Sequence, residues 1–366
     1  MLHGQRQIQY PQRHEKGKYT VMQQHMNRSS VLLIYTGGTI GMQPDPSTGT
    51  LVPFDFNGIY DEFPSLRRLD VELDVLPFDP IDSSNVEPRL WIRLAEIIAE
   101  NYERYDGFVI LHGTDTMAYS SSALSFMLEN LGKPVVFTGS QIPIGVLRTD
   151  GRENLMTAIE IAASKENGRA VVPEVSLYFQ NRLFRANRTK KYSAEELNAF
   201  ASYNYPALAD VGVGIHYRYN AIMPQPKGPF AADTAVSQDV TVVKIFPGIT
   251  EPVLRSMLSV EGVRGIVLET YGAGNAPTFR WFISALEEAI ARGVHIINVT
   301  QCASGAVNMD IYETGRRLSD IGVISGRDIT AEAALTKMMC LLGRDYCPKE
   351  LASMMRRPLR GEMSEE

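Results

Sequence analysis

The stretch that decides the fold is residues 31–41, which read VLLIYTGGTIG. A short apolar run ends here abruptly in two glycines and a threonine. A second stretch of the same kind, residues 107–116, reads GFVILHGTDT. Short continuous apolar runs that stop at glycine are typical of strands buried on both faces, as in a parallel sheet. The two stretches therefore predict parallel strands whose carboxyl ends carry threonine-bearing turns.

The chain continues on both sides of these stretches as strands that alternate with amphipathic helices. In the helix expected at residues 87–105, Pro88 stands in the first turn and apolar residues recur at helical spacing. Continuous apolar strands separated by such helices predict a mostly parallel sheet that is covered on both faces. Besides those quoted, we expect strands at residues 71–76, 134–138 and 175–179, and helices at residues 117–129 and 154–163.

Residues 203–237 interrupt this alternation, because they are rich in Pro, Gly, Ala and Asn. Strands and helices alternate again beyond them, which predicts a second unit of the same class. The predicted fold class is α/β: a larger N-terminal domain, with a mostly parallel sheet and flanking helices, and a smaller C-terminal α/β domain. We expect a disordered or tag-like basic extension at residues 1–28, an N-terminal catalytic domain at 29–214, a linker at 215–239 and a C-terminal domain at 240–366.

The net charge of the chain separates the first residues from the rest. The 366 residues have a formal net charge of −6, although residues 1–28 hold five Lys or Arg side chains and a single acidic one. The remaining chain therefore has a net charge of −10. An acidic body of this kind disfavours nucleic acid or an anionic membrane as the main partner.

The cysteines and the hydropathy pattern predict a cytoplasmic protein. The three cysteines, Cys302, Cys340 and Cys347, are odd in number and have no CxxC spacing. This disfavours a disulfide framework and a structural zinc site, and it fits a reducing compartment. We expect no signal peptide and no membrane span, since no apolar stretch of suitable length follows the first basic residues and no run of about 18 apolar residues occurs later.

Candidate functional residues follow the predicted strands, where ligands bind in open parallel sheets. Each group also has a purely structural interpretation. Gly37 and Gly38 could form a tight turn capped by Thr39, and Thr114 and Asp115 could cap the next helix. His112 could be a buried core histidine, and residues 82–84, which read DSS, could be a polar turn. The chain has no HExxH, GxSxG or GxxxxGK[ST] motif, so zincins, α/β-hydrolases and P-loop proteins lose their main sequence support.

Two longer segments resemble the signature regions of the bacterial L-asparaginases, above all the cytoplasmic, type I branch. Residues 35–42 read YTGGTIGM, and residues 106–143 read DGFVILHGTDTMAYSSSALSFMLENLGKPVVFTGSQIP. The similarity extends through NRLFRANRTKK, YGAGNAP and NVTQCASGAVNM, so that it spans roughly residues 30–360. The resemblance implies an enzyme that hydrolyses the side-chain amide of asparagine to aspartate and ammonia, through a covalent ester on a threonine.

The resemblance assigns four catalytic residues in this sequence. Thr39, the second threonine of TGGT, is expected to be the nucleophile, and Thr114 of GTDT the second catalytic threonine. Lys191, the last residue of NRTKK, is the expected partner of Thr114. A desolvated lysine can be neutral, and a neutral lysine can take a proton from Thr114 or from water. Asp115 is expected to receive the α-ammonium group of the substrate through a charge-assisted hydrogen bond.

The resemblance also implies how the rest of the substrate is bound. Ser83 and Ser84 are expected to bind the α-carboxylate, and backbone N–H groups of the glycine turns, with Gly38 among the binding residues, would stabilise the developing oxyanion. Asn275 of YGAGNAP is expected to reach the site from the second domain of a neighbouring subunit. The family is a tetramer of two close dimers. No metal and no organic cofactor is expected.

The sequence departs from the family in the loop that follows Thr39. This loop usually carries a tyrosine that bonds the nucleophile, whereas residues 44–51 read PDPSTGTL and Thr50 stands near the expected place. In some type I relatives a tyrosine from the C-terminal part takes this role. Tyr312 is therefore our candidate for a further catalytic residue.

A second departure concerns activation by asparagine at a separate site, which occurs in some type I enzymes. An arginine is expected before the YGxGN motif, but this chain has Glu269, and Lys190 replaces a smaller residue. Thr300 and Cys302 of the TQC segment are retained as possible allosteric residues. We therefore expect this mode of activation to be lost or altered.

Two other functions remain as alternatives. The chain could be a non-catalytic sensor that binds an amino acid in the same pocket. It could also be the ammonia-releasing subunit of a tRNA-dependent amidotransferase, although relatives of that kind carry a larger N-terminal domain and a tRNA partner would suit a basic surface. The sequence does not fix the preference between asparagine and glutamine.

Overall fold

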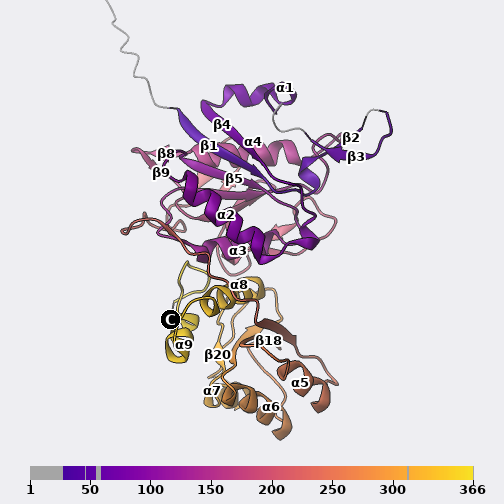
Figure 1. Cartoon of the computed structure of the whole chain (residues 1–366), viewed down its shortest axis with the longest axis vertical. Coiled ribbons are helices and arrows are strands. Elements are labelled where there is room, and N and C mark those ends of the chain that lie inside the picture. Colours follow the sequence, from indigo (N-terminus) through magenta and orange to yellow (C-terminus); the bar gives the residue numbers. More distant parts are fainter. Residues whose placement is uncertain (1–27, 46, 55–58, 311–312, 366) are drawn as a thin grey trace, which may run out of the picture.

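The computed structural model describes residues 28–45, 47–54, 59–310 and 313–365. Two α/β domains are stacked along the long axis of the molecule, the larger N-terminal domain above the smaller C-terminal one (Figure 1). The larger domain holds a mostly parallel sheet with flanking helices, and the smaller one holds a separate parallel sheet. The predicted fold class is confirmed.

The larger domain is built on an eight-stranded sheet in the order β15-β14-β11-β10-β7-β5-β1-β4. Its strands from β4 to β10 are parallel, and the strands beyond β10 are antiparallel. The strands of this sheet are β1 (Ser29–Tyr35), β4 (Val71–Pro77), β5 (Gly107–Leu111), β7 (Val135–Thr138), β10 (Val175–Phe179), β11 (Arg182–Arg185), β14 (Ala209–Val211) and β15 (Ile215–Tyr217).

Both faces of this sheet are covered, which explains why β1 is apolar at successive positions. Leu32 and Ile34 of β1 pack into the cluster that contains α2 and α3, whereas Val31 and Leu33 pack into the cluster on the side of α4. Successive side chains of a strand point to opposite faces, so each face receives alternate residues. The helices of this domain are α1 (Ile59–Glu62), α2 (Pro88–Asn101), α3 (Met117–Met127) and α4 (Gly151–Ala163).

Short strands and turns complete the larger domain. The β2–β3 hairpin projects from it, on the right of Figure 1. The short strands are β2 (Met42–Pro44), β3 (Leu51–Pro53), β6 (Leu128–Glu129), β8 (Lys165–Glu166), β9 (Arg169–Ala170), β12 (Lys190–Lys191), β13 (Phe200–Ala201) and β16 (Ala231–Ala232). The 3-10 turns are η1 (Thr39–Gly41), η3 (Pro64–Arg68), η4 (Ser83–Asn85) and η5 (Ala186–Arg188).

The segment that we expected to be a linker, residues 215–239, contributes strands to the larger domain. β15 forms the edge of the main sheet, and β16 pairs with β6. The expected boundary after residue 214 is therefore too early. The reason is physical: a two- or three-residue edge strand is held by backbone hydrogen bonds to its neighbour, and a Gly- and Pro-rich sequence gives no apolar run that would reveal it.

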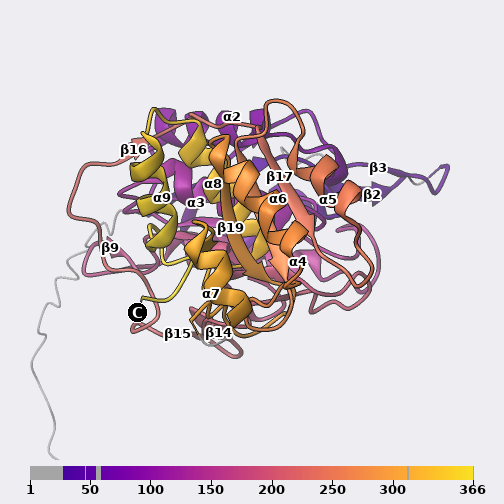
Figure 2. The ribbon, with the colours of Figure 1, turned by 90° about the horizontal axis from the view of Figure 1, so that it is seen from below.

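The smaller domain contains a four-stranded parallel sheet in the order β17-β18-β19-β20. Helices α5, α6 and α7 pack on one face of it and α8 on the other, which Figure 2 shows from below. Helix α8 also packs against α3, so it connects the cores of the two domains. The elements are β17 (Val240–Lys244), α5 (Glu251–Leu258), β18 (Gly265–Thr270), α6 (Arg280–Ala291), β19 (His295–Thr300), α7 (Glu313–Asp320), β20 (Ile324–Ser325), α8 (Ala331–Leu342) and α9 (Pro348–Arg356).

Candidate active site

The turns that follow β1 and β5 touch each other. Gly38 has a φ of +87°, and a Cβ atom added there would lie 2.5 Å from the Cα of Gly113. A side chain at Gly38 would therefore be strained by the backbone and blocked by its neighbour. Thr39 and Thr114 each follow one of these two glycines in the chain. The close approach of the glycines thus brings the two threonine-bearing turns to one place at the carboxyl edge of the sheet.

Thr39 is the first residue of η1, and its side chain is exposed. The turn is fixed to the end of β1, because the Tyr35 hydroxyl donates a 3.1 Å hydrogen bond to the carbonyl oxygen of Gly41. Burial raises the pKa of Tyr35 to about 12, so this phenol keeps its proton and stays a donor at ordinary pH. The nucleophile predicted from the sequence therefore lies at the surface of a turn whose base is fixed.

Lys191 connects the second threonine to the neighbouring carboxylate. Its Nζ donates hydrogen bonds to Thr114 Oγ1 at 2.8 Å and to Asp115 Oδ1 at 2.7 Å. The Lys191 side chain is 17% exposed, whereas that of Asp115 is 66% exposed. The Lys191 side chain is therefore largely shielded from solvent. The Asp115 carboxylate faces solvent, where a cationic group of the substrate can reach it. The predicted set of Thr114, Asp115 and Lys191 is brought together in this structure.

Gln141 also contacts the predicted site, although the sequence assigned no role to it. The Thr114 hydroxyl donates to Gln141 Oε1 at 3.2 Å. The Gln141 backbone N–H is held by the buried Asp150 carboxylate, and its Nε2 donates to the carbonyl oxygens of Ala194 and Glu196, both at 3.2 Å. Its place directly after β7, the strand next to β5, is the sequence signal that could have singled it out.

Ser83 lies against the same glycines from the turn η4. A Cβ atom added at Gly113 would lie 2.5 Å from Ser83 Oγ, and the Thr116 hydroxyl donates to the Ser83 carbonyl oxygen at 2.8 Å. Asp82 accepts hydrogen bonds from the Ser84 N–H at 2.9 Å and the Ser84 hydroxyl at 2.7 Å, and these bonds lower the pKa of Asp82. The DSS segment is thus a fixed turn beside Thr114, and its Ser84 hydroxyl is held by Asp82.

Asn275 lies in the C-terminal domain, in the turn after β18. Tyr271 and Asn275 bridge the base of this turn, and Asn275 Oδ1 accepts a 3.0 Å hydrogen bond from the Thr314 hydroxyl. Among the described residues, no hydrogen bond or ion pair joins Asn275 to the turns after β1 and β5 of the same chain. Within the described residues, the polar partner of the Asn275 side chain is therefore Thr314 of its own domain.

The residues proposed for a second ligand site are only partly brought together. Lys190, Thr300 and Cys302 line one small cavity between the domains. The Thr300 hydroxyl donates to the Gly272 carbonyl oxygen at 2.6 Å and accepts from the Cys302 N–H at 3.0 Å. Glu269 is not among the residues that line this cavity, and its carboxylate lies 3.7 Å from Lys244 Nζ.

Two expectations about the surroundings of the predicted nucleophile concern the β2–β3 hairpin and Tyr312. In the hairpin region the Thr50 hydroxyl lies 2.7 Å from that of Thr48, and Asp45 accepts hydrogen bonds from Ser47 that lower the pKa of Asp45 to about 2. These polar groups bond one another within the loop. Tyr312 lies outside the described residues, so its predicted role remains a prediction.

His112 has the structural role that was one of its two interpretations. The side chain is 1% exposed, and its Nδ1 lies 2.8 Å from the Gly113 carbonyl oxygen. Burial lowers the pKa of His112 to about 4, and the ring is therefore neutral at ordinary pH. A neutral imidazole that holds the Gly113 carbonyl supports the glycine contact described above.

Metal-binding clusters and membrane-spanning helices are both absent from the described part of the chain. It contains no group of three His, Cys, Asp or Glu side chains that could hold a metal ion. None of the helices within residues 28–45, 47–54, 59–310 and 313–365 is long and apolar enough to cross a membrane.

Both domains are similar to those of known proteins. Residues 30–223 match the family model of the asparaginase N-terminal domain, and residues 239–355 match that of the glutaminase/asparaginase C-terminal domain. L-asparaginase 1 of Escherichia coli K12 is 43% identical, over 93% of this chain and 99% of the relative. A glutamyl-tRNA(Gln) amidotransferase subunit of Methanobrevibacter smithii is 32% identical, over 93% of this chain and 78% of the relative. The crystal structure of L-asparaginase I from Vibrio cholerae superposes with a TM-score of 0.83 at 41% identity, covering 92% of this chain and all of that one.

Proposed function

The chain belongs to the asparaginase family, and from this premise we propose that it hydrolyses the side-chain amide of L-asparagine to L-aspartate and ammonia. The observation that carries the proposal is the contact of Lys191 Nζ with both Thr114 and Asp115, beside the glycine turn that bears Thr39. A nucleophilic hydroxyl, a hydroxyl–lysine pair and an exposed carboxylate supply the groups that amide hydrolysis of a free amino acid needs.

We infer that Thr39 is the nucleophile of the first half-reaction. Its Oγ adds to the amide carbon of the substrate, the C–N bond then breaks, and ammonia leaves with the proton that Thr39 gave up. The product of this step is an ester between the β-carboxyl group of aspartate and Thr39. Backbone N–H groups of the turns at Gly38 and Gly113 would stabilise the oxyanion that forms on the amide oxygen, an effect typically worth about 3–4 kcal/mol.

In the second half-reaction Thr114 and Lys191 would activate water. The 2.8 Å hydrogen bond between Lys191 Nζ and Thr114 Oγ1 gives a path for a proton between the two groups. When the substrate's α-ammonium group binds Asp115, it replaces Lys191 as the cationic partner of that carboxylate. A neutral Lys191 can accept a proton from Thr114 or from the attacking water. The ester bond breaks, and Thr39 recovers its proton.

The substrate's charged groups suit the exposed part of the site. Asp115 is 66% exposed, so an α-ammonium group can reach it from solvent. Ser83 stands beside Gly113, Ser84 follows it in η4, and the two residues would bind the α-carboxylate. A substrate held at both ends of its amino-acid backbone is a free amino acid rather than a residue of a peptide. No cofactor or metal enters this mechanism.

We propose that the site is completed by a second copy of the chain. Asn275 is expected to contribute its amide to a neighbouring subunit's site, and within the described part of its own chain no hydrogen bond or ion pair joins it to the turns that bear Thr39 and Thr114. A homotetramer made of two close dimers would place the Asn275 turn of one subunit at the site of its neighbour. The acidic chain disfavours nucleic acid or a membrane as a further partner, and we propose a cytoplasmic location.

The test of the proposed function is ammonia release from L-asparagine by the purified chain without tRNA, with L-glutamine in parallel. We expect release from L-asparagine that follows saturation kinetics. Glutamine is longer than asparagine by one methylene group, which typically changes the free energy of transition-state binding by about 1–3 kcal/mol. The ratio of the two rates therefore measures how closely the pocket fits the asparagine side chain. A chain that binds asparagine and releases no ammonia would be a sensor. Release that appears only with charged tRNA present would identify an amidotransferase subunit.

Tyr312→Phe should slow formation of the ester. If Tyr312 replaces the tyrosine that the loop of residues 44–51 lacks, its hydroxyl helps Thr39 lose a proton, and kcat should fall by about tenfold or more. Pre-steady-state measurement of the first ammonia released would locate the loss in acylation. Tyr346→Phe, in the C-terminal domain outside the site, is the matched control. A turnover number that Tyr312→Phe leaves unchanged would refute the assignment.

Asparagine kinetics should be hyperbolic. Glu269 stands where activated relatives have an arginine, its carboxylate faces Lys244, and it does not line the cavity that holds Cys302. A ligand carboxylate would meet another carboxylate at position 269 in place of the arginine. Initial rates over a wide range of asparagine concentrations test this expectation. Sigmoidal kinetics that Cys302→Ala abolishes would show that the second site is active.

A further inference from the structure

Residues 359–364, which follow α9, are anchored inside the C-terminal domain by a fully buried ion pair. Glu362 and Lys337 of α8 are both 0% exposed, and Lys337 Nζ lies 2.6 Å from Glu362 Oε1. Glu362 also accepts the backbone N–H groups of Leu359 and Arg360, at 3.0 and 2.8 Å. One carboxylate therefore fixes both the fold of the 359–364 segment and its place on α8. A buried charge held by several hydrogen bonds in this way is costly to disturb.

The same segment is bonded to the N-terminal domain through η5. Arg188 Nε donates to the Gly361 carbonyl oxygen at 2.7 Å, and Asn187 Nδ2 donates to the Arg360 carbonyl oxygen at 3.0 Å. Both side chains are almost fully buried. Gly361 has a φ of +70°, and a Cβ atom there would lie 2.3 Å from Arg185 Nη1. The 359–364 segment is thus packed directly against the last residue of β11 and against η5.

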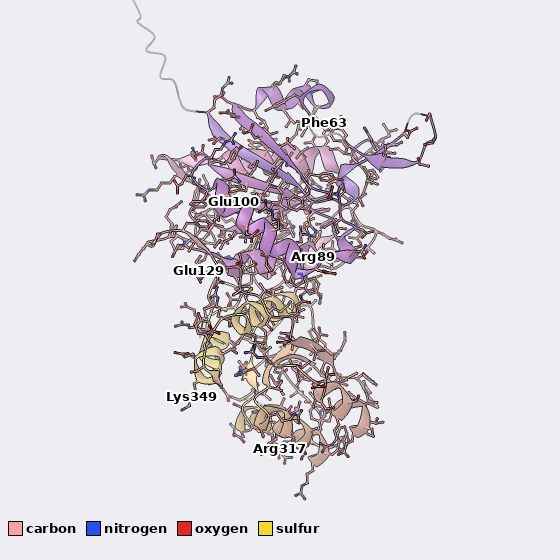
Figure 3. The ribbon with its side chains drawn as sticks, in the orientation of Figure 1. Phe63, Arg89, Glu100, Glu129, Arg317 and Lys349 are labelled. Atoms are coloured by element: carbon pink, nitrogen blue, oxygen red, sulfur yellow. The ribbon has the colours of Figure 1, made fainter. Side chains whose placement is uncertain are left out.

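Arg188 also connects the 359–364 segment to Asp328, which in turn bonds Ser364 of the segment. Its Nη1 lies 2.7 Å from Asp328 Oδ2, and Asp328 in turn accepts the N–H and the hydroxyl of Ser364 at 2.7 and 2.6 Å. These bonds lower the pKa of Asp328 against the effect of its burial. At the edge of the N-terminal domain, Glu129 lies 3.5 Å from Arg360 Nη2, and Figure 3 labels Glu129 where that domain meets the C-terminal one.

The residues held by this segment immediately precede the catalytic lysine. η5 ends at Arg188, the N–H of Thr189 bonds back to Ala186, and Lys191 lies in β12, which begins at Lys190. The Lys191 backbone therefore lies three and four residues after Arg188 and Asn187, which make buried contacts with the 359–364 segment. The Lys191 side chain must reach Thr114 and Asp115, which belong to the turn after β5. A shift of η5 would change the distance from Lys191 Nζ to Thr114 Oγ1 and the distance from Lys191 Nζ to Asp115 Oδ1.

We propose that the 359–364 segment positions Lys191 for catalysis, with Glu362 as the positioning residue. The proposal rests on the proposed function, because it takes Lys191 to be the partner of Thr114. Glu362 touches no reacting atom. It holds the segment on α8, the segment holds Arg188 and Asn187, and these residues fix the start of β12. The C-terminal domain thereby also supports the lysine of the same chain's own site.

The test compares Glu362→Ala with a variant that loses stability without touching η5. Leu286→Ala removes a fully buried side chain from the core of the smaller domain on α6 and serves as the matched control. We expect Glu362→Ala to lower kcat for asparagine by about tenfold or more, with a KM changed by less than about threefold, since small displacements of a catalytic group cost rate rather than binding. Leu286→Ala should keep its kcat at temperatures where it is folded.

Amide hydrogen exchange supplies a readout that does not depend on the reaction. In Glu362→Ala the amides of residues 186–191 should exchange at least about tenfold faster than in the unchanged protein and in Leu286→Ala. Glu362→Gln, which keeps the oxygen that accepts from Leu359 and Arg360, should recover part of both effects. If Glu362→Ala does not fold, Gly361→Ala tests the same point, because its new methyl group would lie 2.3 Å from Arg185 Nη1 and would disturb the contact between the segment and Arg185.

The proposal is overturned if exchange at residues 186–191 and kcat change no more in these variants than in Leu286→Ala. It is equally overturned if exchange rises while kcat stays constant in a chain where Lys191 is essential. If Lys191→Met proves fully active, the proposed function of Lys191 fails, and the exchange result still reports whether the segment holds η5.

Discussion

Thr39→Ala is expected to abolish ammonia release from L-asparagine, with kcat reduced by about 10⁴-fold or more. Removing the nucleophile of a covalent mechanism has effects of this size, because no other group can form the intermediate. Thr39 is exposed at the start of η1, and the turn is held by Tyr35 and by the contact of Gly38 with Gly113. Its side chain is thus not needed for the turn to fold, so the loss of activity reports chemistry.

Two control variants and one binding measurement accompany Thr39→Ala. Thr39→Ser keeps a hydroxyl and should retain measurable turnover. Thr241→Ala, on β17 in the smaller domain, removes a threonine of no catalytic role and should behave as the unchanged protein. Isothermal titration of Thr39→Ala with L-asparagine should still detect binding. Substantial ammonia release by Thr39→Ala would refute its assignment as the nucleophile.

Lys191→Met should lower kcat by about 10²–10⁴-fold, the usual contribution of a positioned acid or base. The expected structural cost is small, because Asp115 is 66% exposed and an exposed ion pair adds little to the free energy of unfolding. The variant should therefore fold with a nearly unchanged Tm. Single-turnover experiments should show the second half-reaction slowed, with the ester on Thr39 accumulating and detectable by mass spectrometry.

A lysine with a similar ion pair elsewhere provides the control for Lys191. Lys165 Nζ lies 2.7 Å from Asp106 Oδ2, and the Lys165 side chain is 32% exposed. Asp106 directly precedes β5, so this pair lies at the amino end of that strand, away from the candidate site. Lys165→Met removes a charge and an ion pair with the same 2.7 Å distance outside the site, and its kcat should stay within about twofold of the unchanged value. Equal losses in the two variants would mean that Lys191 acts only through stability.

The local pattern of the sequence was sufficient for the fold class because the central strands β1, β5 and β7 each contain a run of at least three consecutive apolar residues. Val31–Leu33 supply side chains to both faces of the sheet, and only a sheet covered on both sides gives such a run. The same reasoning could not find β15 and β16, which lie in the expected linker. Strands of two or three residues are held by partners elsewhere in the chain, and their own sequence carries no period.

The position of the threonine-bearing turns at the carboxyl ends of β1 and β5 could also be predicted from the sequence, since glycine and threonine closely follow each strand. Membership of the asparaginase family was likewise evident from two signature segments, and the family models that match both domains confirm it. The role of Gln141 was not, although it also follows a central strand. Its contact with Thr114 depends on the Asp150 carboxylate that fixes its backbone.

The sequence by itself determined the fold class, the family and the identity of the threonine-bearing turns, because these depend on residues that are neighbours along the chain. The tertiary structure alone decided which groups meet. Lys191 and Thr114 are 77 positions apart, and Arg188 and Gly361 are 173 positions apart. Such contacts arise from the order of strands in a sheet and from the packing of two domains, and no local pattern of side chains encodes them.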